Sequence, residues 1–473
     1  MNNFKTILIC FLAFNVLAYN AISKENPKKP NVIFFISDDL NVDIGCYGHP
    51  QVKTPNLDKF REKVMVFDHA YVQYPMCNAS RNSFMSGTYP PKNRSYNGCL
   101  RDNMTGAVTL PELFKNNGYK TISSGKVFHC TDPQSWSEIS DMRSSGILPK
   151  GKPREFYRPP YKDEEACIGE GRNLTDNLVA NLRWMEWRSV TQKEELLFDA
   201  MLEKAVKNRT EELSESGEPF FMAIGLRRPH DPFYAPKRFF DMYPLDSIQV
   251  PTTPDDASPI PDIAFGQMKK IFDQLSEQDA KEFIRSYYAG ISYMDNQFGM
   301  MLDLMQKRGL LDNTVIVFSG DNGYLPGEKG WFNKGVLFER ACQVPFLIGY
   351  SGMKNEGQRC ERVVEFVDIF PTITELCGLE NPQSQLDGKS LVPLLNNPES
   401  DWKDVAVTWF GYDRSIRDSQ YRYIKWGSNT EALYDHKNDK GEFYNLAENS
   451  EYKEVVERMR KELETFQKRE SKK

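Results

Sequence analysis

The stretch "NVIFFISDDL", residues 31–40, is a short apolar run that stops at two aspartates. Continuous apolar runs of this length are typical of strands that are buried on both faces of a sheet. Three further runs end in polar residues in the same way: "YKTISSGKVFH" (119–129), "PFFMAIGLRRPH" (219–230) and "NTVIVFSGDNG" (313–323). The sequence therefore predicts four buried strands, of which the run at 119–129 has the weakest pattern.

Segments with helical periodicity lie between these runs. They include "TPNLDKFREK" (54–63), "LPELFKNNG" (110–118) and "SYMDNQFGMMLDLMQKRG" (292–309). Buried strands that alternate with amphipathic helices are typical of α/β proteins, in which helices cover both faces of a parallel sheet. We therefore predict an α/β fold with a large, mostly parallel sheet sandwiched by helices.

The polar residues that end the four runs are expected to meet. The carboxyl ends of parallel strands share one edge of a sheet, and ligands bind in the crevice beyond that edge. The residues brought there include carboxylates, an amide, a lysine and two histidines: Asp38, Asp39, Asp321, Asn322, Lys126, His129 and His230. This convergence predicts a functional site.

Three carboxylates in one crevice would repel each other unless some are protonated or a cation lies among them. The cation is the simpler interpretation for Asp38, Asp39 and Asp321 with the amide of Asn322. Oxygen ligands favour Ca²⁺, with Mg²⁺ as the alternative, over zinc. The competing interpretation is that the paired aspartates cap the N-terminus of a following helix.

The sequence pattern changes after residue 398. Short strand-like pieces follow, namely "VAVTWF" (405–410), "SQYRYIKW" (419–426) and "EALYDHKNDKGEFYNLA" (431–447), and a charged helix starts at about Glu451. This pattern predicts a small antiparallel sheet with a helix packed on it. We therefore divide the chain into a catalytic domain at 24–398 and a C-terminal α+β subdomain at 399–473.

The first 23 residues have the pattern of a secretory signal peptide, with Lys5, an apolar run and small residues near Ser23. A retained signal anchor is the alternative, although the run is short for a stable membrane span. We expect an exported protein, periplasmic or secreted, with eight cysteines after the signal. Export permits disulfides, but spacing does not give their pairing. The net charge of −6 and the lack of a long basic run argue against a nucleic-acid partner.

Cys77 lies in "PMCNASRNSFMSG" (75–87) with no cysteine close to it in the sequence. A helix that begins near Ser80 would place Cys77 at the positive end of the helix dipole, where a group is poised to become or to meet an anion. The competing interpretations are half of a disulfide or a small buried apolar residue.

The segment "CNASRNSFMSG" resembles the signature of the type I, formylglycine-dependent sulfatases of the alkaline-phosphatase superfamily. That signature reads Cys or Ser, any residue, Pro, Ser and Arg, followed by Leu or Met, Thr or Ser, and Gly. Further segments resemble the iduronate-2-sulfatase-like members in the same order: "SDDLNVDIGCYG", "TPNLDKF", "LPELFKNNGYKTISSGKVFHC", "RRPHDPFYAPKRFFDMYPLDSI", "GDNGYLPGEKGWFNKGVLFE", "VDIFPTITELCGL" and "SIRDSQYRYIKW". The resemblance covers nearly all of the chain after the signal.

The resemblance implies that Cys77 is converted to formylglycine, an aldehyde, by a formylglycine-generating enzyme or an anaerobic sulfatase-maturating enzyme. In this family one hydroxyl of the hydrated aldehyde attacks the sulfur of a sulfate ester, and the second hydroxyl then expels sulfate. The metal ligands implied are Asp38, Asp39, Asp321, Asn322 and the group derived from Cys77.

The resemblance also assigns roles to the charged residues around that group. Arg81 would hold the hydrated aldehyde and the metal site, and His129 would bond to the hydrate and help its deprotonation. Lys126, His230 and Lys334 would bind sulfate oxygens, with His230 or Lys334 protonating the leaving oxygen.

Three positions depart from the family pattern. Ala79 replaces the proline of the signature, as in some substrates of the anaerobic maturating enzyme, and Asn322 stands where the iduronate-2-sulfatase-like members have histidine. Lys329 occupies the histidine position of a Gly-Glu-His triplet. The role of Lys329 is open, although added positive charge near the mouth of the site would suit an anionic polymer.

The substrate implied is a sulfated saccharide, such as a uronic-acid-containing glycan from ulvan or a glycosaminoglycan. Candidates for sugar stacking and carboxylate contacts are Trp331, Trp409, Tyr412, Arg414 and Arg101. Two other functions stay open. One is a phosphomonoester or phosphodiester hydrolase of the same superfamily, and the other is a binder of sulfated glycans that lacks the aldehyde because Cys77 stays unmodified.

Overall fold

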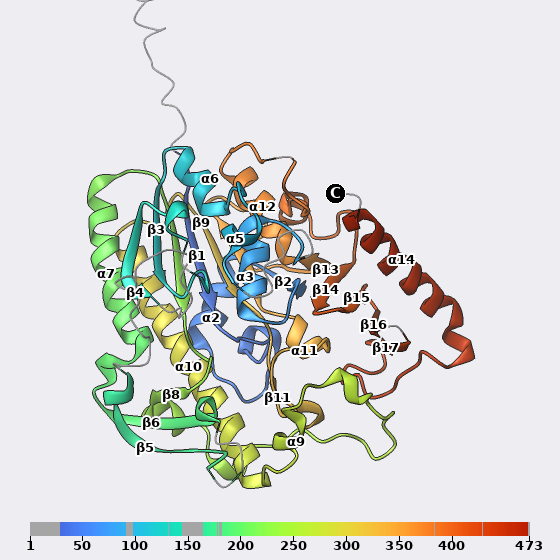
Figure 1. The fold of residues 1–473 in the computed structure, drawn as a ribbon. Helices are drawn as coiled ribbons and strands as arrows, with labels where there is room; N and C mark the ends of the chain where they lie inside the picture. Colours follow the sequence, from blue (N-terminus) through green and yellow to red (C-terminus); the bar gives the residue numbers. More distant parts are fainter. Residues whose placement is uncertain are drawn as a thin grey trace, which may run out of the picture.

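The computed structural model describes residues 29–90, 98–130, 132–143, 164–176, 178, 182–382, 384–427 and 429–471 (Figure 1). The predicted signal peptide at 1–23 lies outside these residues. No helix within the described ranges is both long and apolar enough to span a lipid bilayer.

An eight-stranded sheet forms the centre of the molecule, with the strand order β13-β2-β12-β9-β1-β7-β3-β4. Its strands are β1 (Asn31–Ser37), β2 (Met65–Tyr71), β3 (Lys120–Gly125), β4 (Glu138–Arg143), β7 (Phe220–Leu226), β9 (Thr314–Gly320), β12 (Phe346–Tyr350) and β13 (Arg359–Glu365). All but β12 run in the same direction. The prediction of a mostly parallel sheet is confirmed, and each of the four apolar runs forms one of its strands.

Helices cover both faces of this sheet (Figure 1). Alternate residues of β1 point to opposite sides, so Ile33 and Phe35 join one apolar core and Phe34 joins the other. The first core also takes side chains from α2 (Pro55–Phe60), α7 (Phe198–Ser216) and α10 (Glu277–Lys307). The second takes them from α3 (Cys77–Ser86), α6 (Leu110–Asn116) and α12 (Ile369–Leu376).

Two helices differ from the prediction in their start. Helix α3 begins at Cys77, three residues before the predicted start at Ser80, and Ser80 does not cap it. Helix α10 begins at Glu277, well before the predicted segment, because Ser276 and Asp279 form a capping box there. Cys77 is therefore the first residue of its helix, at the positive end of the dipole.

The C-terminal region contains the predicted antiparallel sheet, a meander of β14 (Ala406–Phe410), β15 (Asp413–Arg417), β16 (Tyr421–Trp426) and β17 (Thr430–Asp435). Helix α14 (Lys453–Ser471) packs on it through Val456, Met459 and Leu463. Strand β15 was not predicted. The domain boundary at residue 398 stays a prediction.

Smaller elements complete the fold. Strands β5 (Ile168–Asn173), β6 (Glu186–Gln192) and β8 (Phe233–Pro236) form a separate sheet that the sequence did not predict. Strands β10 (Leu325–Pro326) and β11 (Phe332–Asn333) form a short hairpin. The short helices are α5 (Leu100–Asn103), α8 (Lys237–Phe240), α9 (Lys269–Phe272), α11 (Glu339–Cys342) and α13 (Val392–Asn396).

The structure pairs Cys99 with Cys130 in a disulfide. The other cysteines of the described residues, Cys77 among them, are free and buried. The interpretation of Cys77 as half of a disulfide is therefore wrong.

Candidate active site

The carboxyl ends of β1 and β9 bring Asp38, Asp39, Asp321 and Asn322 together, as predicted. All four side chains are buried. The backbone N–H of Asp39 donates to Oδ1 of Asp321 over 2.9 Å, which ties the two strand ends to each other. Asp39 has a left-handed backbone conformation with φ of 61°. Such a conformation is uncommon for a residue other than glycine and marks a position that its surroundings hold in place.

Tyr287 of α10 supports this strained position and was missed at the sequence level. Its hydroxyl donates to the backbone carbonyl of Asp39 over 2.7 Å and accepts from the N–H of Asn41. One tyrosine among many in a long amphipathic helix gives no signal of such a role. The role of Tyr287 follows only from the packing of α10 against the end of β1.

Cys77 lies at the centre of this edge. Its Sγ is 2.8 Å from Nζ of Lys334 and 3.4 Å from Oδ1 of Asp39. Burial, together with Asp38 and Asp39, raises the pKa of the Cys77 thiol well above its ordinary value. The thiol is therefore neutral near pH 7 and poorly suited to act as a thiolate nucleophile.

Arg81 holds the two strand ends from the next turn of α3. Its Nε donates to Oδ2 of Asp321 over 2.7 Å, and its Nη2 lies 3.3 Å from Oδ1 of Asp38. The same guanidinium donates to the carbonyls of Lys126 and Val127. Because it is fully buried and bonds to three segments, Arg81 fixes the relative positions of β1, β9 and the end of β3.

Two lysines place positive charge beside the aspartates. Nζ of Lys126 bonds to Asp38, and Nζ of Lys334 bonds to Asp39. Burial alone would raise the pKa of Asp38, but Lys126, His230 and Arg81 hold it well below its ordinary value. Burial alone would lower the pKa of Lys334, but the Asp39 carboxylate and the Cys77 sulfur raise it well above its ordinary value.

His230 faces the same aspartates. Its Nε2 lies 3.8 Å from Oδ2 of Asp38 and 3.7 Å from Oδ2 of Asp39. Its Nδ1 is 2.6 Å from the backbone carbonyl of Asp231. Because a carbonyl only accepts, Nδ1 carries a proton, and Nε2 is the ring nitrogen that faces the two carboxylates.

His129 is the least engaged of the predicted residues. Its Nδ1 is buried and has no hydrogen-bond partner among the described residues. Burial and the positive charge of Lys126 lower the pKa of His129 to about 3, so the ring is neutral near pH 7.

The residues present fit a hard cation. Oδ2 of Asp39 and Oδ1 of Asn322 are buried oxygens without a hydrogen-bond partner among the described residues. Asp38, Asp39, Cys77 and His230 each offer a ligand atom within 4.8 Å of the others. Buried acceptors are rarely left unsatisfied. Oxygen donors of this kind suit Ca²⁺ or Mg²⁺.

The model of the family described as "Sulfatase" matches residues 30–379, which is most of the chain. This chain belongs to the sulfatase family. A second model, for the C-terminal region of N-sulphoglucosamine sulphohydrolase, matches residues 327–469. The sulfatase is therefore a sulfuric ester hydrolase of the alkaline-phosphatase superfamily.

Individual relatives agree with this family. A sulfatase of Formosa agariphila is 31% identical over 469 residues, covering 96% of this chain and 89% of the relative. Human iduronate 2-sulfatase is 28% identical and covers 84% of each chain. A solved structure described as a complex with its substrate, D-glucosamine-2-N,6-O-disulfate, superposes with a TM-score of 0.71 at 21% identity, over 94% of this sulfatase and 99% of that chain.

The structure corrects part of the predicted substrate-contact set. Trp331 and Trp409 are 4% and 0% exposed, so both are packing residues and cannot stack on a sugar. Arg101 is paired with Asp132 and Glu112 over 2.9 and 2.7 Å. Tyr412 is 95% exposed at the surface, whereas Arg414 bonds to the backbone carbonyls of Gly411 and Asp413.

The suggestion that Lys329 adds charge near the mouth of the site is wrong. Lys329 is buried, and its Nζ donates to the carbonyls of Gly441 and Glu442 in the C-terminal region. Lys329 therefore lies where the segment around residue 329 contacts the C-terminal region at residues 441–442.

A second group of titratable residues, Glu339, His436 and Glu442, lies beside that contact. The two glutamates already have partners. Arg422 bonds to Glu339 and lies 3.0 Å from Glu442, and Tyr71 donates to Glu339 over 2.7 Å. These neighbours satisfy the carboxylates without a metal ion, so the group joins α11 to the C-terminal sheet as a buried ion network.

We expect this network to make the sulfatase sensitive to acid. Burial alone would raise the pKa of Glu339, but His436, Arg422 and Arg417 hold it well below its ordinary value of 4.5. A carboxyl whose pKa is lower in the folded state stabilises the fold above its unfolded pKa, and this stabilisation is lost as the pH falls through the folded pKa. The melting temperature should therefore drop steeply below about pH 4.5.

A glutamine variant tests this prediction. Glu339→Gln should lose up to about 3–5 kcal/mol of stability at pH 7, because it removes one of the two carboxylates that pair with the buried Arg422. Its melting temperature should also depend less on pH between about 3 and 6. Glu212→Gln, at an exposed position on α7, is the control and should behave like wild type. An unchanged acid transition in Glu339→Gln would contradict the prediction.

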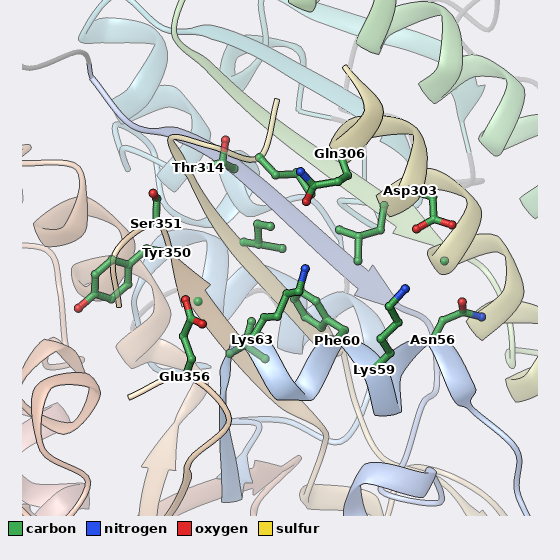
Figure 2. Close-up of a pocket in the computed structure, with 16 residues that line it drawn as sticks. Asn56, Lys59, Phe60, Lys63, Asp303, Gln306, Thr314, Tyr350, Ser351 and Glu356 are labelled. Atoms are coloured by element: carbon green, nitrogen blue, oxygen red, sulfur yellow. The ribbon is translucent and has the colours of Figure 1, made fainter. Parts of the chain in front are cut away.

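A cavity of about 250 Å³ opens at the opposite edge of the large sheet, between α2, α10, β9 and β12 (Figure 2). Its lining includes the apolar side chains of Phe60 and Ile316 and the lysines Lys59 and Lys63. Thr314, the first residue of β9, lines it, whereas Asp321 follows the last residue of β9. The cavity is therefore separate from the candidate active site.

Proposed function

We propose that this sulfatase removes sulfate from a sulfated saccharide, with Cys77 as the precursor of its nucleophile. The observation that carries the proposal is the position of Cys77, whose Sγ lies 2.8 Å from Nζ of Lys334 and 3.4 Å from Oδ1 of Asp39. A neutral, buried thiol cannot itself attack sulfate readily. Conversion of Cys77 to formylglycine would supply a hydrate that attacks sulfur and later releases sulfate.

The residues around Cys77 suit an anionic sulfate ester. Lys126 and Lys334 approach the crevice from the ends of β3 and β11, and both are buried. Cations in a water-poor site stabilise negative charge that grows on sulfate oxygens in the transition state. Both lysines bond to aspartates in the structure, so they are held in place before substrate enters.

Two histidines are proposed to handle protons. Nε2 of His230 faces the crevice, and its Nδ1–H is fixed on the carbonyl of Asp231. Protonated Nε2 would donate to the leaving sugar oxygen, with Lys334 as the alternative donor. Neutral His129 would accept a hydrogen bond from the group derived from Cys77.

A Ca²⁺ ion, or Mg²⁺, is proposed to be held by Asp38, Asp39, Asp321, Asn322 and the group derived from Cys77. When bound, it would lower the pKa of the nucleophilic hydroxyl and offset the charge of the sulfate. Arg81 would keep Asp38 and Asp321 in register for that ion, since it bonds to both carboxylates.

The names of the relatives support a sugar substrate. One relative is named for iduronate 2-sulfate chemistry, and one neighbouring structure carries a disulfated glucosamine as its substrate. We therefore propose uronic-acid-containing glycans, such as ulvan or glycosaminoglycan fragments, as the substrate class. We further propose that residues 1–23 direct export to the periplasm or the medium.

The test is the mass of the Cys77 peptide from protein made in its own host, together with sulfate release. We expect the mass of formylglycine or its hydrate, and release of sulfate from sulfated oligosaccharides. Aryl sulfate should be hydrolysed at least about 100-fold faster than aryl phosphate. An unmodified thiol with glycan binding and no turnover would support the binding protein, and a preference for aryl phosphate would support the phosphoester hydrolase.

A further inference from the structure

The hairpin of β10 and β11 delivers Lys334 to the active site. Leu325 pairs with Asn333 and Pro326 with Phe332, and Lys334 follows at once. The next residue, Gly335, donates its N–H to the carbonyl of Pro75, two residues before Cys77. The position of Nζ of Lys334 therefore depends on how this hairpin is held.

Lys329, at the tip of the hairpin, is held by the C-terminal region. Its Nζ donates to the carbonyls of Gly441 and Glu442 over 2.8 and 2.7 Å. The same ammonium lies 4.9 Å from the ring centre of Phe338 and 4.7 Å from that of Phe443. The two hydrogen bonds join residues that are more than 100 positions apart in the sequence.

The backbone at this tip is strained. Lys329 has a left-handed conformation with φ of 57°, between two glycines that also have positive φ. This conformation costs free energy for a residue with a side chain, and contacts around it must offset that cost. A buried ammonium adds a desolvation cost that an apolar side chain between the two phenyl rings would avoid. Packing alone therefore does not explain a lysine here.

Trp331 connects the tip to the active-site lysine. Its Nε1 donates to the carbonyl of Lys334 over 3.1 Å, and its ring stacks on Phe265 at 5.2 Å. Trp331 therefore links the backbone of Lys334 to the tip of the hairpin, which lies just before it in the chain. A shift of the tip would move the backbone that carries Nζ.

We propose that Lys329 is a positioning residue that acts on catalysis through Lys334. It fixes the hairpin against residues 441–442 of the C-terminal region, and the hairpin holds Nζ of Lys334 beside Cys77 and Asp39. This inference rests on the role proposed above for Lys334. It also gives the C-terminal region a part in positioning Lys334, since Glu442 accepts from the N–H of Glu339 and so belongs to the buried ion network.

A double-mutant cycle tests the inference on the mature enzyme with a sulfated substrate. Lys329→Met keeps the stem between Phe338 and Phe443 but removes the three donors. It should lower kcat/KM about tenfold in the wild-type background. In a Lys334→Ala background it should change kcat/KM by less than about twofold, because residues that act through one another are not additive. Lys329→Arg should restore most of the activity.

Lys403→Met is the matched control. Lys403 is a half-buried lysine whose side chain is 16% exposed; it bonds to Glu365 and lies 3.4 Å from Asp368. It should lose stability while keeping kcat/KM within about twofold below its melting temperature. If Lys329→Met does not fold, Trp331→Phe replaces it, since it removes the Nε1–H donor to the carbonyl of Lys334 and keeps an aromatic ring at this position.

The outcomes separate the two ideas. An unchanged kcat/KM in Lys329→Met, or the same loss in the Lys334→Ala background, would overturn the positioning role. An unchanged kcat/KM in Lys334→Ala alone would instead overturn the role of Lys334 in the proposed function.

Discussion

Replacing Cys77 by alanine is expected to lower sulfate release by at least about 10⁴-fold, the scale of loss when an enzyme loses its nucleophile. Alanine keeps the start of α3 and removes only Sγ, which contacts Lys334 and Asp39. The melting temperature should therefore stay within a few degrees of wild type. Metal content, measured by mass spectrometry of the purified variant, should fall only partly, because four other ligands are proposed to remain.

Cys342→Ala provides the control for this experiment. Cys342 is also free and fully buried, but it lies in α11 with its Sγ near the carbonyl of Val336. That variant should lose some stability from the cavity it leaves and keep its turnover. Sulfate release by Cys77→Ala at more than a trace of the wild-type rate would mean that another group attacks the ester, and the proposed mechanism would fall.

Removal of the divalent cation is expected to have the second-largest effect. A chelator should lower kcat/KM by at least about 100-fold, and Ca²⁺ should restore it. The physical reason lies in the buried oxygens Oδ2 of Asp39 and Oδ1 of Asn322, which have no partner in the described structure. Without an ion these acceptors stay unsatisfied, so the melting temperature should also fall on chelation.

Asn322→Leu tests the same site without a chelator. Leucine has a similar size but no oxygen, so the affinity for Ca²⁺, measured by calorimetry on the apoprotein, should fall about 10- to 100-fold. Asn355→Leu is a control at a partly exposed position, where the amide bonds to the carbonyls of Leu395 and Asn396. Equal Ca²⁺ affinity in wild type and Asn322→Leu would exclude Asn322 as a ligand.

The sheet and its catalytic edge were predictable because burial leaves a direct trace in the sequence. A strand covered on both faces, such as Val32–Ile36, must be apolar throughout, and its end is marked by the first polar residues. The sheet of β5, β6 and β8 leaves no such trace. Its strands "IGEGRN" and "EWRSVTQ" are partly exposed and polar, so they read as loops.

The active site also contains contacts that the sequence predicts and contacts that it does not. The meeting of Asp38 and Asp39 with Asp321 follows from parallel strands and was predicted from the residues. The contact between Cys77 and Lys334 joins positions 257 apart and follows from no local pattern, so only the family resemblance indicated it. Trp331 shows the opposite failure, because an aromatic residue in a glycine-rich loop looks available for sugar and is in fact enclosed by Phe265 and Phe272.

The enclosure of Cys77 has a consequence for the proposed maturation of this enzyme. The side chain is 5% exposed, and Ala79 and Arg81 beside it are fully buried. The proposed conversion of Cys77 to formylglycine would require a second enzyme to reach Sγ, which the finished α3 encloses. We therefore expect this oxidation to come before this part of the chain folds. A molecule that folds before modification would keep its thiol for as long as it stays folded. The active fraction of a preparation would then depend on the rate of modification relative to the rate of folding during synthesis.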